Sequence, residues 1–409
     1  MMANQIAVTQ LVGNAMLAEL ANNNSLLLTG ARTYESDFQM SEYKIGDTLQ
    51  IRRQNQFTVN DGRVGVLQDV IDRTEPLVIA HQLNVTIEYS SRELTLFVDT
   101  GQGPFNERVI RPAIQNISKQ AETLISQGAV NQLNFTSGNP AAPVNSFAIV
   151  DLVYAKMQEQ AIQINNDAYM ALAPRQASAL KAANQNAFNP TLNEDISFAS
   201  ALGHYSAFDM FSNQSIQFHT VGAGAGGAVV ASTVVSGSSS VNLSGLGVSV
   251  TGVYLPGDVI RFTGINSVNP TDRTDTGQLM DFVVLNQVDS TAGGLGTVNV
   301  YPPIVSDPAS PYRNVTGPVT AGTTVTLEGA PGSRYHVNLA YAPRGLDIVI
   351  PPMEVLNNVD TSVVTDKDLN ISLRVGRQGS IQNDVNMLRV DMLFGFKWHP
   401  DYCVRLHSL

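Results

Sequence analysis

The stretch HTVGAGAGGAVVAS, residues 219–232, contains Gly222, Gly224 and Gly227 in the spacing G-x-G-x-x-G. This spacing occurs in the phosphate-binding turn of dinucleotide-binding domains, where glycine lets the backbone approach a pyrophosphate. A turn of that kind follows a strand, opens a helix and is followed about 20 residues later by an acidic residue. Whether the flanking sequence meets these conditions decides the fold class of the chain.

The flanking sequence fails two of the three conditions. Residues 215–221, SIQFHTV, are compatible with a strand. The segment AVVASTVVSGSSSVNL after the glycines is β-branched and serine-rich and is therefore a poor helix former. The next acidic residue is Asp258, far beyond the expected spacing. We therefore expect no dinucleotide cofactor, and we interpret four glycines as a hinge that permits sharp or positive-φ backbone: Gly222, Gly224, Gly226 and Gly227.

The composition describes a chain with unusually few charges. Only 14% of the 409 residues are charged, and 24 basic residues stand against 35 acidic ones, for a formal net charge of −11. The sequence contains no run of lysine or arginine, which argues against a surface that grips nucleic acid. Surfaces with few charges can meet other protein chains without a large desolvation cost.

No pattern of side chains points to catalysis or to a metal site. The single cysteine, Cys403, excludes an intrachain disulfide and a cysteine-based metal site, and we expect it to be buried. The six histidines are too widely spaced for two to share one helical turn. Asp360, Asp366 and Asp368 lack the glycine and final glutamate of a calcium loop, so we interpret them as a solvated turn.

The N-terminal sequence lacks the basic start and continuous apolar core of a signal peptide, and no apolar run approaches 18 residues. We therefore expect a protein that is made in the cytosol and does not enter a membrane.

The first hundred residues are expected to form an arm and an extended hairpin. Residues 1–30 are loosely amphipathic, and KIGDTLQIRRQNQFTVNDG then alternates up to a turn signal at Asp61–Gly62. The alternation resumes in EPLVIAHQLNVTIEYSS, which predicts a long two-stranded excursion over residues 41–88. Arg52 and Arg53 form a basic doublet on it, interpreted either as a solvated edge or as partners for an acidic patch on a neighbouring chain.

Helices and strands then alternate. Residues 104–127 carry Ile110, Ile114, Ile117, Ala121 and Leu124 on one face of a predicted helix that stops at Gly128. A second helix is expected over 145–163, capped by Asn145 or Ser146, followed by the strand AYMALAP and a helix opening at Pro174. This order predicts an α/β domain.

Residues 228–342 differ in composition from what precedes them. Short β runs such as DVIRFTGI, MDFVVLNQV and TTVTLEG are separated by turn signals at short intervals, which predicts a small barrel or sandwich. The segments GLDIVIPPM and VNMLRVDMLFGFKWHPDYCVRL that follow are strand-like again. We therefore expect the β block to be an insertion within another domain.

The order of these parts resembles the major capsid proteins of tailed double-stranded-DNA bacteriophages, which have the HK97-like fold. The run YMALAPRQASAL followed by GHYSAFDMFSNQSI is similar to the apical domain of that family. GDVIRFTGI, DFVVLNQVDSTAGGLGTVNVYPPIV and HVNLAYAPRGLDIVIPPM resemble the inserted β domain, and the return from it, in coat proteins of short-tailed enterobacterial phages.

The resemblance implies an α+β fold with six parts in chain order. These are an N-terminal arm (1–40), an extended loop with peripheral-domain strands (41–103), a spine helix (104–128), the first part of an apical domain (129–214), an inserted β-barrel domain (215–342), and a return to the apical and peripheral domains (343–409). It also implies pentamers and hexamers of an icosahedral head enclosing double-stranded DNA without sequence-specific binding. Scaffolding protein, a portal ring and a decoration protein are the implied partners, in the host cytoplasm during assembly and then in the virion.

One departure from the relatives concerns contacts between capsomers. Their inserted domain carries a charged bridging loop, whereas VVASTVVSGSSSVNLSG has no charge here. Asp272, Arg273 and Asp275 on another loop are the candidate substitutes, beside Arg52 and Arg53 on the hairpin. Two alternatives stay open: an encapsulin-like shell or decoration protein, and a dinucleotide-dependent oxidoreductase.

Overall fold

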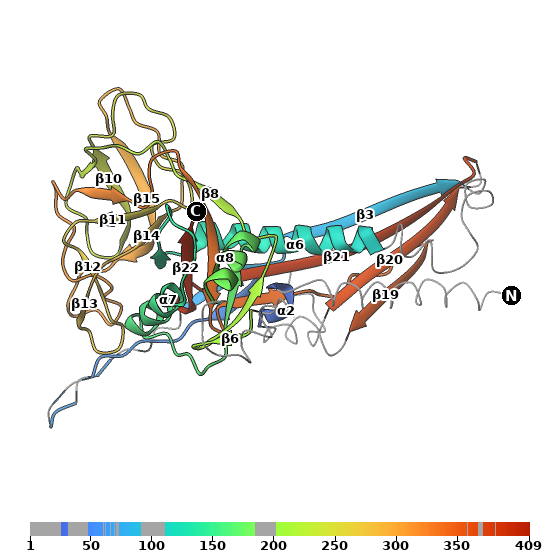
Figure 1. Cartoon of the computed structure of the whole chain (residues 1–409), viewed down its shortest axis with the longest axis horizontal. Coiled ribbons are helices and arrows are strands. Elements are labelled where there is room, and N and C mark those ends of the chain that lie inside the picture. Colours follow the sequence, from blue (N-terminus) through green and yellow to red (C-terminus); the bar gives the residue numbers. More distant parts are fainter. Residues whose placement is uncertain are drawn as a thin grey trace. The chain divides into compact units, whose positions relative to one another are not determined.

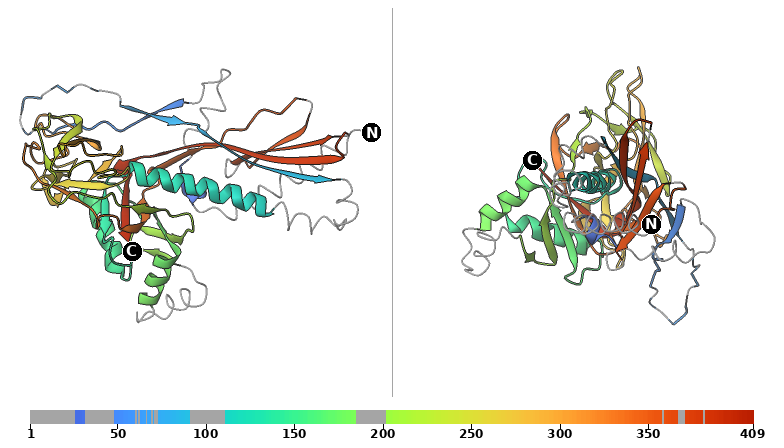
Figure 2. Two further views of the ribbon diagram at one scale, coloured as in Figure 1. Left: turned by 90° about the horizontal axis from the view of Figure 1, so that it is seen from above. Right: turned by 90° about the vertical axis from the view of Figure 1, so that its right-hand side faces the viewer.

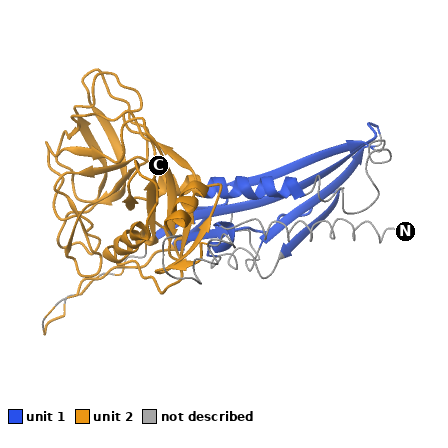
Figure 3. Ribbon diagram, in the orientation of Figure 1, with its two compact units in different colours: residues 1–51, 74–125, 346–397 blue, residues 52–73, 126–345, 398–409 orange. Residues whose placement is uncertain are grey.

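The computed structural model describes residues 26–31, 48–90 except 60, 62, 66, 69, 71 and 72, 111–184, 202–357, 359–366, 371–380 and 382–409. Few helices and many strands make up these ranges, which confirms the α+β class expected from the sequence (Figure 1). The chain divides into two compact units, each built from segments distant in sequence (Figure 3). One unit comprises residues 1–51, 74–125 and 346–397, and the other comprises residues 52–73, 126–345 and 398–409.

The first unit is organised around a five-stranded sheet. Its strands are β18 (Leu346–Val349), β21 (Val385–Trp398), β20 (Ile371–Ser380), β19 (Asp360–Asp366) and β3 (His81–Ser90). β3 lies antiparallel to β21 along its whole length, from His81 opposite Phe394 to Ser90 opposite Val385 (Figure 2). Exposure alternates along β3, as expected for a strand with two different faces.

The pairing of β3 corrects the predicted two-stranded excursion over 41–88. Only β1 (Thr48–Arg52) and β2 (Thr74–Val78) pair with each other, and their Ile51 and Leu77 pack with Val349 in a small apolar cluster. The alternation of apolar and polar residues predicts a strand over residues 81–90. Its partner strand lies about 300 residues further along the chain, so the local sequence pattern could not identify it. The predicted turn at Asp61–Gly62 involves Gly62, which lies outside the described residues.

The solvated turn predicted at Asp360 and Asp366 is also wrong, because both residues belong to β19. Asp360 lies opposite Arg377 of β20 in an antiparallel ladder. The valines and threonines between the two aspartates favour a strand, and their β propensity outweighs the acidic residues at its ends. Asp368 lies outside the described residues.

Among the described residues the longest helix is α6, which spans Arg111–Gln132. Ile114, Ile117 and Ala121, at steps of three and four, are buried, which confirms this part of the predicted face, while Leu124 is half-buried. The predicted stop at Gly128 is wrong, because the helix continues for another turn. Ala129 and Val130 are buried, and their packing outweighs the low helix propensity of one glycine. Residues 104–110 lie outside the described part.

The predicted N-terminal arm 1–40 lies outside the described residues, except for residues 26–31. There α2 (Leu26–Thr29) buries Leu26 and Leu27. The backbone N–H of Leu26 donates to Glu122 Oε1 at 2.9 Å, which satisfies one of the unpaired donors at the helix start.

A seven-stranded mixed sheet forms one part of the second unit. Its strands are β4 (Thr136–Gly138), β22 (Cys403–Ser408), β17 (Arg334–Tyr341), β5 (Ala168–Leu172), β7 (Phe208–Ser212), β6 (His204–Tyr205) and β8 (Phe218–Thr220), the last paired with β17. β4 and β22 are parallel, as are β5 and β7. Cys403 is buried, as expected.

Two helices accompany this sheet, both near their predicted positions. α7 spans Phe147–Glu159, and the Ser146 hydroxyl accepts a hydrogen bond from the N–H of Ala148, which confirms Ser146 as its N-cap. α8 (Pro174–Asn184) opens with proline, which has no N–H to leave unpaired. None of the helices that the structure describes is both long and apolar enough to cross a bilayer.

Six of the strands between residues 229 and 327 form a second sheet in this unit. Its order is β16 (Val325–Leu327), β11 (Val259–Phe262), β14 (Phe282–Val284), β15 (Gly296–Ile304), β10 (Ser238–Ser244) and β9 (Val229–Val230). The two ends of this order meet: Val229 bridges Thr324, and the N–H of Val230 donates to the carbonyl of Thr323 at 2.9 Å. The six strands therefore close into a barrel, with Phe262 and Phe282 among its buried side chains.

Candidate assembly surfaces

The glycine-rich stretch that follows β8 begins at Gly222, which is held by hydrogen bonds. The N–H of Gly222 donates to Asp258 Oδ2 at 3.1 Å, and Asp258 is fully buried. The same carboxylate is contacted by His219 Nε2 at 2.7 Å and accepts from the N–H of Leu255 at 2.7 Å. A Cβ at Gly222 would lie 2.5 Å from the carbonyl oxygen of Val253, so only glycine fits this close approach.

The remaining glycines of the stretch differ from one another. Gly224 has φ +64° and donates its N–H to the carbonyl of Val253 at 2.9 Å, so it uses the left-handed region that favours glycine. Gly226 and Gly227 are exposed, and a Cβ on either would meet nothing within 4 Å. Strand β9 follows, where a dinucleotide-binding turn would open a helix. Gly226 and Gly227 therefore have room for a side chain, whereas Gly222 does not.

Residues 52–73 connect β1 to β2, and we call them the connecting loop. Its two ends are anchored within the second unit. The Arg53 guanidinium pairs with Asp401 and lies 3.4 Å from the Tyr301 hydroxyl, and its N–H donates to the carbonyl of Arg73 at 2.8 Å. The Arg73 guanidinium lies 4.4 Å from the centroid of the Tyr312 ring. Arg53 thus has its carboxylate partner in its own chain, whereas Arg52 is exposed.

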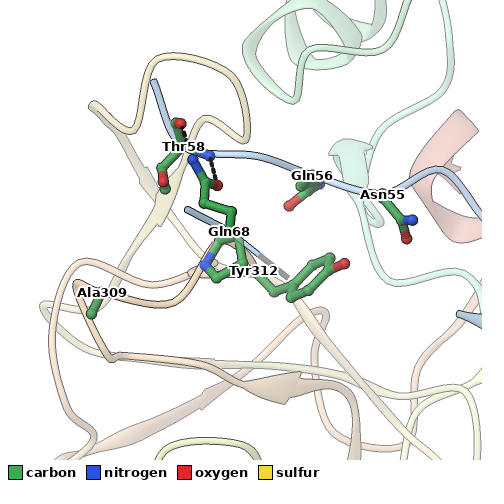
Figure 4. A pocket seen from close by; sticks show the side chains of 7 residues that line it. Asn55, Gln56, Thr58, Gln68, Ala309 and Tyr312 are labelled. Carbon is green, nitrogen blue, oxygen red and sulfur yellow. Dashed lines mark hydrogen bonds between the residues drawn. The ribbon is translucent and has the colours of Figure 1, made fainter. Parts of the chain in front are cut away.

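The distal part of the connecting loop exposes apolar side chains. Thr58 and Gln68 hold its two limbs together, because the N–H of Thr58 donates to Gln68 Oε1 at 2.8 Å and Gln68 Nε2 donates to the carbonyl of Thr58 at 2.6 Å (Figure 4). Beyond them, Val59 is 95% and Leu67 100% exposed. Further exposed apolar side chains on this loop are Phe57, Val64 and Val70. Exposed apolar side chains in this number make the loop a candidate interaction surface.

A shallow recess lies beside this loop. It is lined from the loop by Asn55, Gln56, Thr58 and Gln68, and from the barrel side by Ala309, Pro311 and Tyr312. Figure 4 shows the side chains of Gln68 and Tyr312 next to each other in it. Its polar amide lining offers hydrogen bonds but no charged group.

The second set of predicted interface residues lies on the hairpin of β12 (Asn266–Val268) and β13 (Asp275–Leu279). Asp272 and Asp275 are exposed, and hydrogen bonds from Thr274 and from Asn266, respectively, lower the pKa of each carboxyl. Arg273, with φ +62°, donates to the carbonyls of Ser310 at 2.8 Å and Pro311 at 2.5 Å. The arginine therefore fixes the hairpin, and the two aspartates present negative charge outward.

The sequence analysis missed a cluster of charged side chains that is largely buried in the second unit. It consists of Lys156, Arg261, Asp281, Glu328, Arg405 and His407, and we call it the buried charge cluster. Asp281 contacts Arg261 Nε at 2.5 Å and Lys156 Nζ at 3.3 Å, and Arg261 also pairs with Glu328. Single charges within apolar strands, such as Arg261 in VIRF and Arg405 in CVRLHS, were the available signal.

The buried charge cluster joins the barrel to the mixed sheet. Arg261 lies on β11, while Arg405 and His407 lie on β22. Arg405 is fully buried, and its Nη1 donates to the carbonyls of Val130 at 2.9 Å and Gly257 at 3.1 Å. Three basic side chains are balanced by two carboxylates in the cluster and by Asp258 close by, which is how buried charges are tolerated.

Two side chains of the cluster have strongly shifted pKa values. Burial lowers the pKa of His407 to about 4. The negative charge of Glu328 offsets this effect only in part, and the positive charge of Arg405 adds to it. Burial disfavours the ionised form of Glu328, but His407 and Arg261 outweigh it and lower the pKa of Glu328 to about 2. His407 Nδ1 lies 3.9 Å from Glu328 Oε1, too far for a hydrogen bond, so this interaction is through space. At neutral pH the histidine is uncharged and the glutamate ionised.

Comparison with known families identifies one match that spans most of the sequence. The family described as "P22 coat protein - gene protein 5" matches residues 39–402. A search of curated proteins gave no match.

Several solved structures are similar at low sequence identity. The structure titled "Mycobacterium phage Che8" shares 10% identity at a TM-score of 0.47, over 94% of this chain and 90% of that one. The asymmetric unit of the bacteriophage PhiM1 mature capsid shares 11% identity at a TM-score of 0.38, over 89% and 82%. The CUS-3 coat protein I-domain shares 21% identity at a TM-score of 0.19, over 24% of this chain and 92% of that one.

Proposed function

We propose that this chain assembles as pentamers and hexamers of an icosahedral shell around double-stranded DNA. The chain belongs to the P22 coat protein family and is a major capsid protein that forms a phage head. The observation that carries this proposal is the family match over residues 39–402. A structural role also agrees with the low charge content, since faces with few charges associate at little desolvation cost. The encapsulin-like, decoration-protein and oxidoreductase alternatives are not favoured by this match.

We further propose that the chain is divided as in HK97-like capsid proteins, with residues 215–342 as the inserted domain. The pairing of β8 with β17 supports this division, because Thr220 lies opposite Arg334 and Phe218 opposite His336. The chain thus leaves for the barrel and returns from it on adjacent strands of the mixed sheet. Gly226 and Gly227, just before the barrel, are the proposed hinge when the shell expands.

The connecting loop is the element we propose for contact with a neighbouring subunit. Its apolar side chains, Leu67 and Val59 foremost, are exposed in the single chain and gain burial only against another surface. Arg52 is the proposed charged partner on the same element, since Arg53 is engaged with Asp401. Asp272 and Asp275 on the β12–β13 hairpin remain candidates for contacts between capsomers.

The proposed partners during assembly are a scaffolding protein and a portal ring in the host cytoplasm, and a decoration protein is a further candidate on the mature head. The net charge of −11 supports a container that encloses DNA without gripping it, because binding by counterion release requires many basic side chains.

Expression of the chain with and without the scaffolding protein of the same phage tests the proposal. We expect icosahedral shells by electron microscopy when the scaffolding protein is present, and monomers or irregular aggregates without it. Uniform small shells that form unaided around an enzyme would support the encapsulin-like alternative instead. A chain that stays monomeric in both preparations would overturn the proposed function.

A further inference from the structure

We propose that Arg175, Phe218, Arg334 and His336, which we call the basic–aromatic patch, form a docking site for a carboxylate of a second copy of this chain. The inference rests on the proposed self-assembly and adds to it a named surface and a partner chemistry. None of these four residues belongs to the connecting loop, the β12–β13 hairpin or the buried charge cluster.

The patch is built on the ladder between β8 and β17. Phe218 lies directly opposite His336, and their ring centroids are 3.8 Å apart. The Arg334 guanidinium carbon lies 4.3 Å from the centroid of the Phe218 ring, in a cation–π arrangement. Because side chains alternate along a strand, Arg334 and His336 lie on the same face of β17.

The start of α8 brings Arg175 to that face. Asn338, two residues after His336 on the same face, accepts a hydrogen bond from the N–H of Ala173 at 2.8 Å. Arg175 follows two residues later, in the first turn of α8. Burial, then Arg175 and Arg334, lower the pKa of His336, so both arginines add positive potential at the same place.

The positive charge of the patch is not neutralised within the described residues. Arg175 and Arg334 are exposed, and no carboxylate of the described chain lies within ion-pair distance of either. Arg53, Arg261, Arg374 and Arg389, by contrast, each pair with an aspartate. His336 is only 8% exposed, and its Nδ1 is buried without a hydrogen-bond partner in the described structure.

One amide side chain next to the patch is already engaged. Gln176, next to Arg175, accepts from the N–H of Val144 at 2.8 Å and donates to the carbonyl oxygen of Leu409 at 2.5 Å. The two arginines and the 45% exposed Phe218 ring are therefore what the patch presents to a partner, with His336 packed beneath them.

A carboxylate is the partner that this chemistry fits. The planar guanidinium binds a carboxylate with two parallel hydrogen bonds, and the Phe218 ring beside it excludes water from the pair. The partner is assigned to a second copy because the chain carries 35 acidic residues against 24 basic ones, and copies of it meet in a shell. Two arginines are too few to hold the phosphates of double-stranded DNA, which needs many neutralised contacts.

Charge reversal tests the patch in the full chain. The variant R175E/R334E is compared with R344E, which reverses another exposed arginine outside the patch. Circular dichroism and the urea midpoint first show that each chain is folded. We expect assembly, followed by light scattering and sedimentation, to slow by at least about tenfold in R175E/R334E and by less than about twofold in R344E. Phe218→Leu keeps the charge and loses the cation–π contact, so a smaller loss is expected.

Salt and conservative replacement give a second readout. The wild-type rate is expected to fall between about 0.05 and 0.5 M NaCl, whereas the slow rate of R175E/R334E changes less. R175K/R334K keeps the charge without the planar fork and is expected to assemble at an intermediate rate.

Three outcomes would overturn the proposal. One is a wild-type assembly rate for R175E/R334E, and another is an equal loss in R344E. The third is normal assembly combined with loss of DNA-fragment binding by the unassembled chain, which would assign the patch to nucleic acid. In all three the wild type assembles, so the proposed function stands. Only a wild-type chain that never self-associates would remove both proposals.

Discussion

The connecting loop and the buried charge cluster invert the usual distribution of side chains. At residues 52–73 apolar side chains such as Leu67 are exposed to solvent, whereas Arg405 and Asp281 are removed from it. This difference in burial shows which interactions stabilise each region. The charges of the buried cluster are compensated mainly within one chain, by ion pairs and main-chain carbonyls, although Arg405 Nε and Nη2 make no hydrogen bond in the described structure. The loop, by contrast, buries its apolar surface only if another chain covers it. Substitutions in the two regions should therefore separate folding of the subunit from assembly.

The largest effect on folding is expected from Asp281→Ala. This change removes the carboxylate that pairs with Lys156 and one of the two that pair with Arg261, the other being Glu328, so a buried lysine loses its ion pair. We expect a loss of about 3–5 kcal/mol in the free energy of unfolding, measured by urea denaturation of the unassembled chain. Asp289→Ala, at an exposed carboxylate, is the matched control and should change stability by less than about 0.5 kcal/mol. Equal losses in both variants would contradict the proposed importance of the cluster.

The next largest effect is expected in the pH dependence of the free energy of unfolding, through the titration of His407. Its pKa is about 4 in the folded chain and about 6.5 when unfolded, so between these values only the unfolded chain binds the proton. The contribution of neutral His407 to the free energy of unfolding is therefore complete above pH 6.5. It is lost as the pH falls toward 4, and the total loss is about 3 kcal/mol. Glu328 adds a second stabilising contribution, which is complete above pH 4.5 and is lost as the pH falls toward 2.

Urea midpoints of the wild type and His407→Asn at pH 7.5 and 4.5 measure the first of these losses. The variant should lose most of the difference between the two pH values. His204→Asn, at an exposed histidine beside Asp209, should keep it. A full pH dependence in His407→Asn would show that other groups are responsible.

A smaller effect is expected from Gly222→Ala. The new methyl group would lie 2.5 Å from the Val253 carbonyl oxygen and 2.9 Å from Asp258, and the backbone must shift to admit it. We expect a loss of about 1–3 kcal/mol, measured by the same denaturation. Gly227→Ala, whose methyl group meets nothing within 4 Å, should stay within about 0.5 kcal/mol. A large loss at Gly227 would mean that this glycine, too, is fixed by packing.

The double variant Val59→Ser/Leu67→Ser is expected to have the smallest effect on the stability of the subunit. Its effect on shell assembly should be large. Both side chains are almost fully exposed, so the urea midpoint should change little. Shell yield, measured by sedimentation after co-expression with scaffolding protein, should fall several-fold because the apolar contact with a neighbour is lost. Val248→Ser, at an exposed valine of the barrel, is the control, and an unchanged yield in the double variant would refute the docking role of the loop.

The glycine-rich stretch shows what the local sequence can and cannot predict. Its poor helix-forming continuation and the absence of a nearby acid argued against a cofactor site, and β9 indeed follows it. The acid that does appear, Asp258, accepts hydrogen bonds from the N–H of Gly222 and of Leu255. That contact joins residues 36 apart, and no spacing rule within the stretch could have placed it.

The sequence by itself determined the elements whose causes lie within a few residues: the Ser146 cap of α7, the proline start of α8, the buried face of α6 and the β strands of the barrel region. Only the tertiary structure decided that β3 pairs with β21, that Val229 and Thr324 close the barrel, and that Arg405 is buried. Periodicity, caps and turns act along the chain over one or two turns of backbone. Strand partners and charge compensation depend on residues hundreds of positions apart, which meet only once the chain has folded.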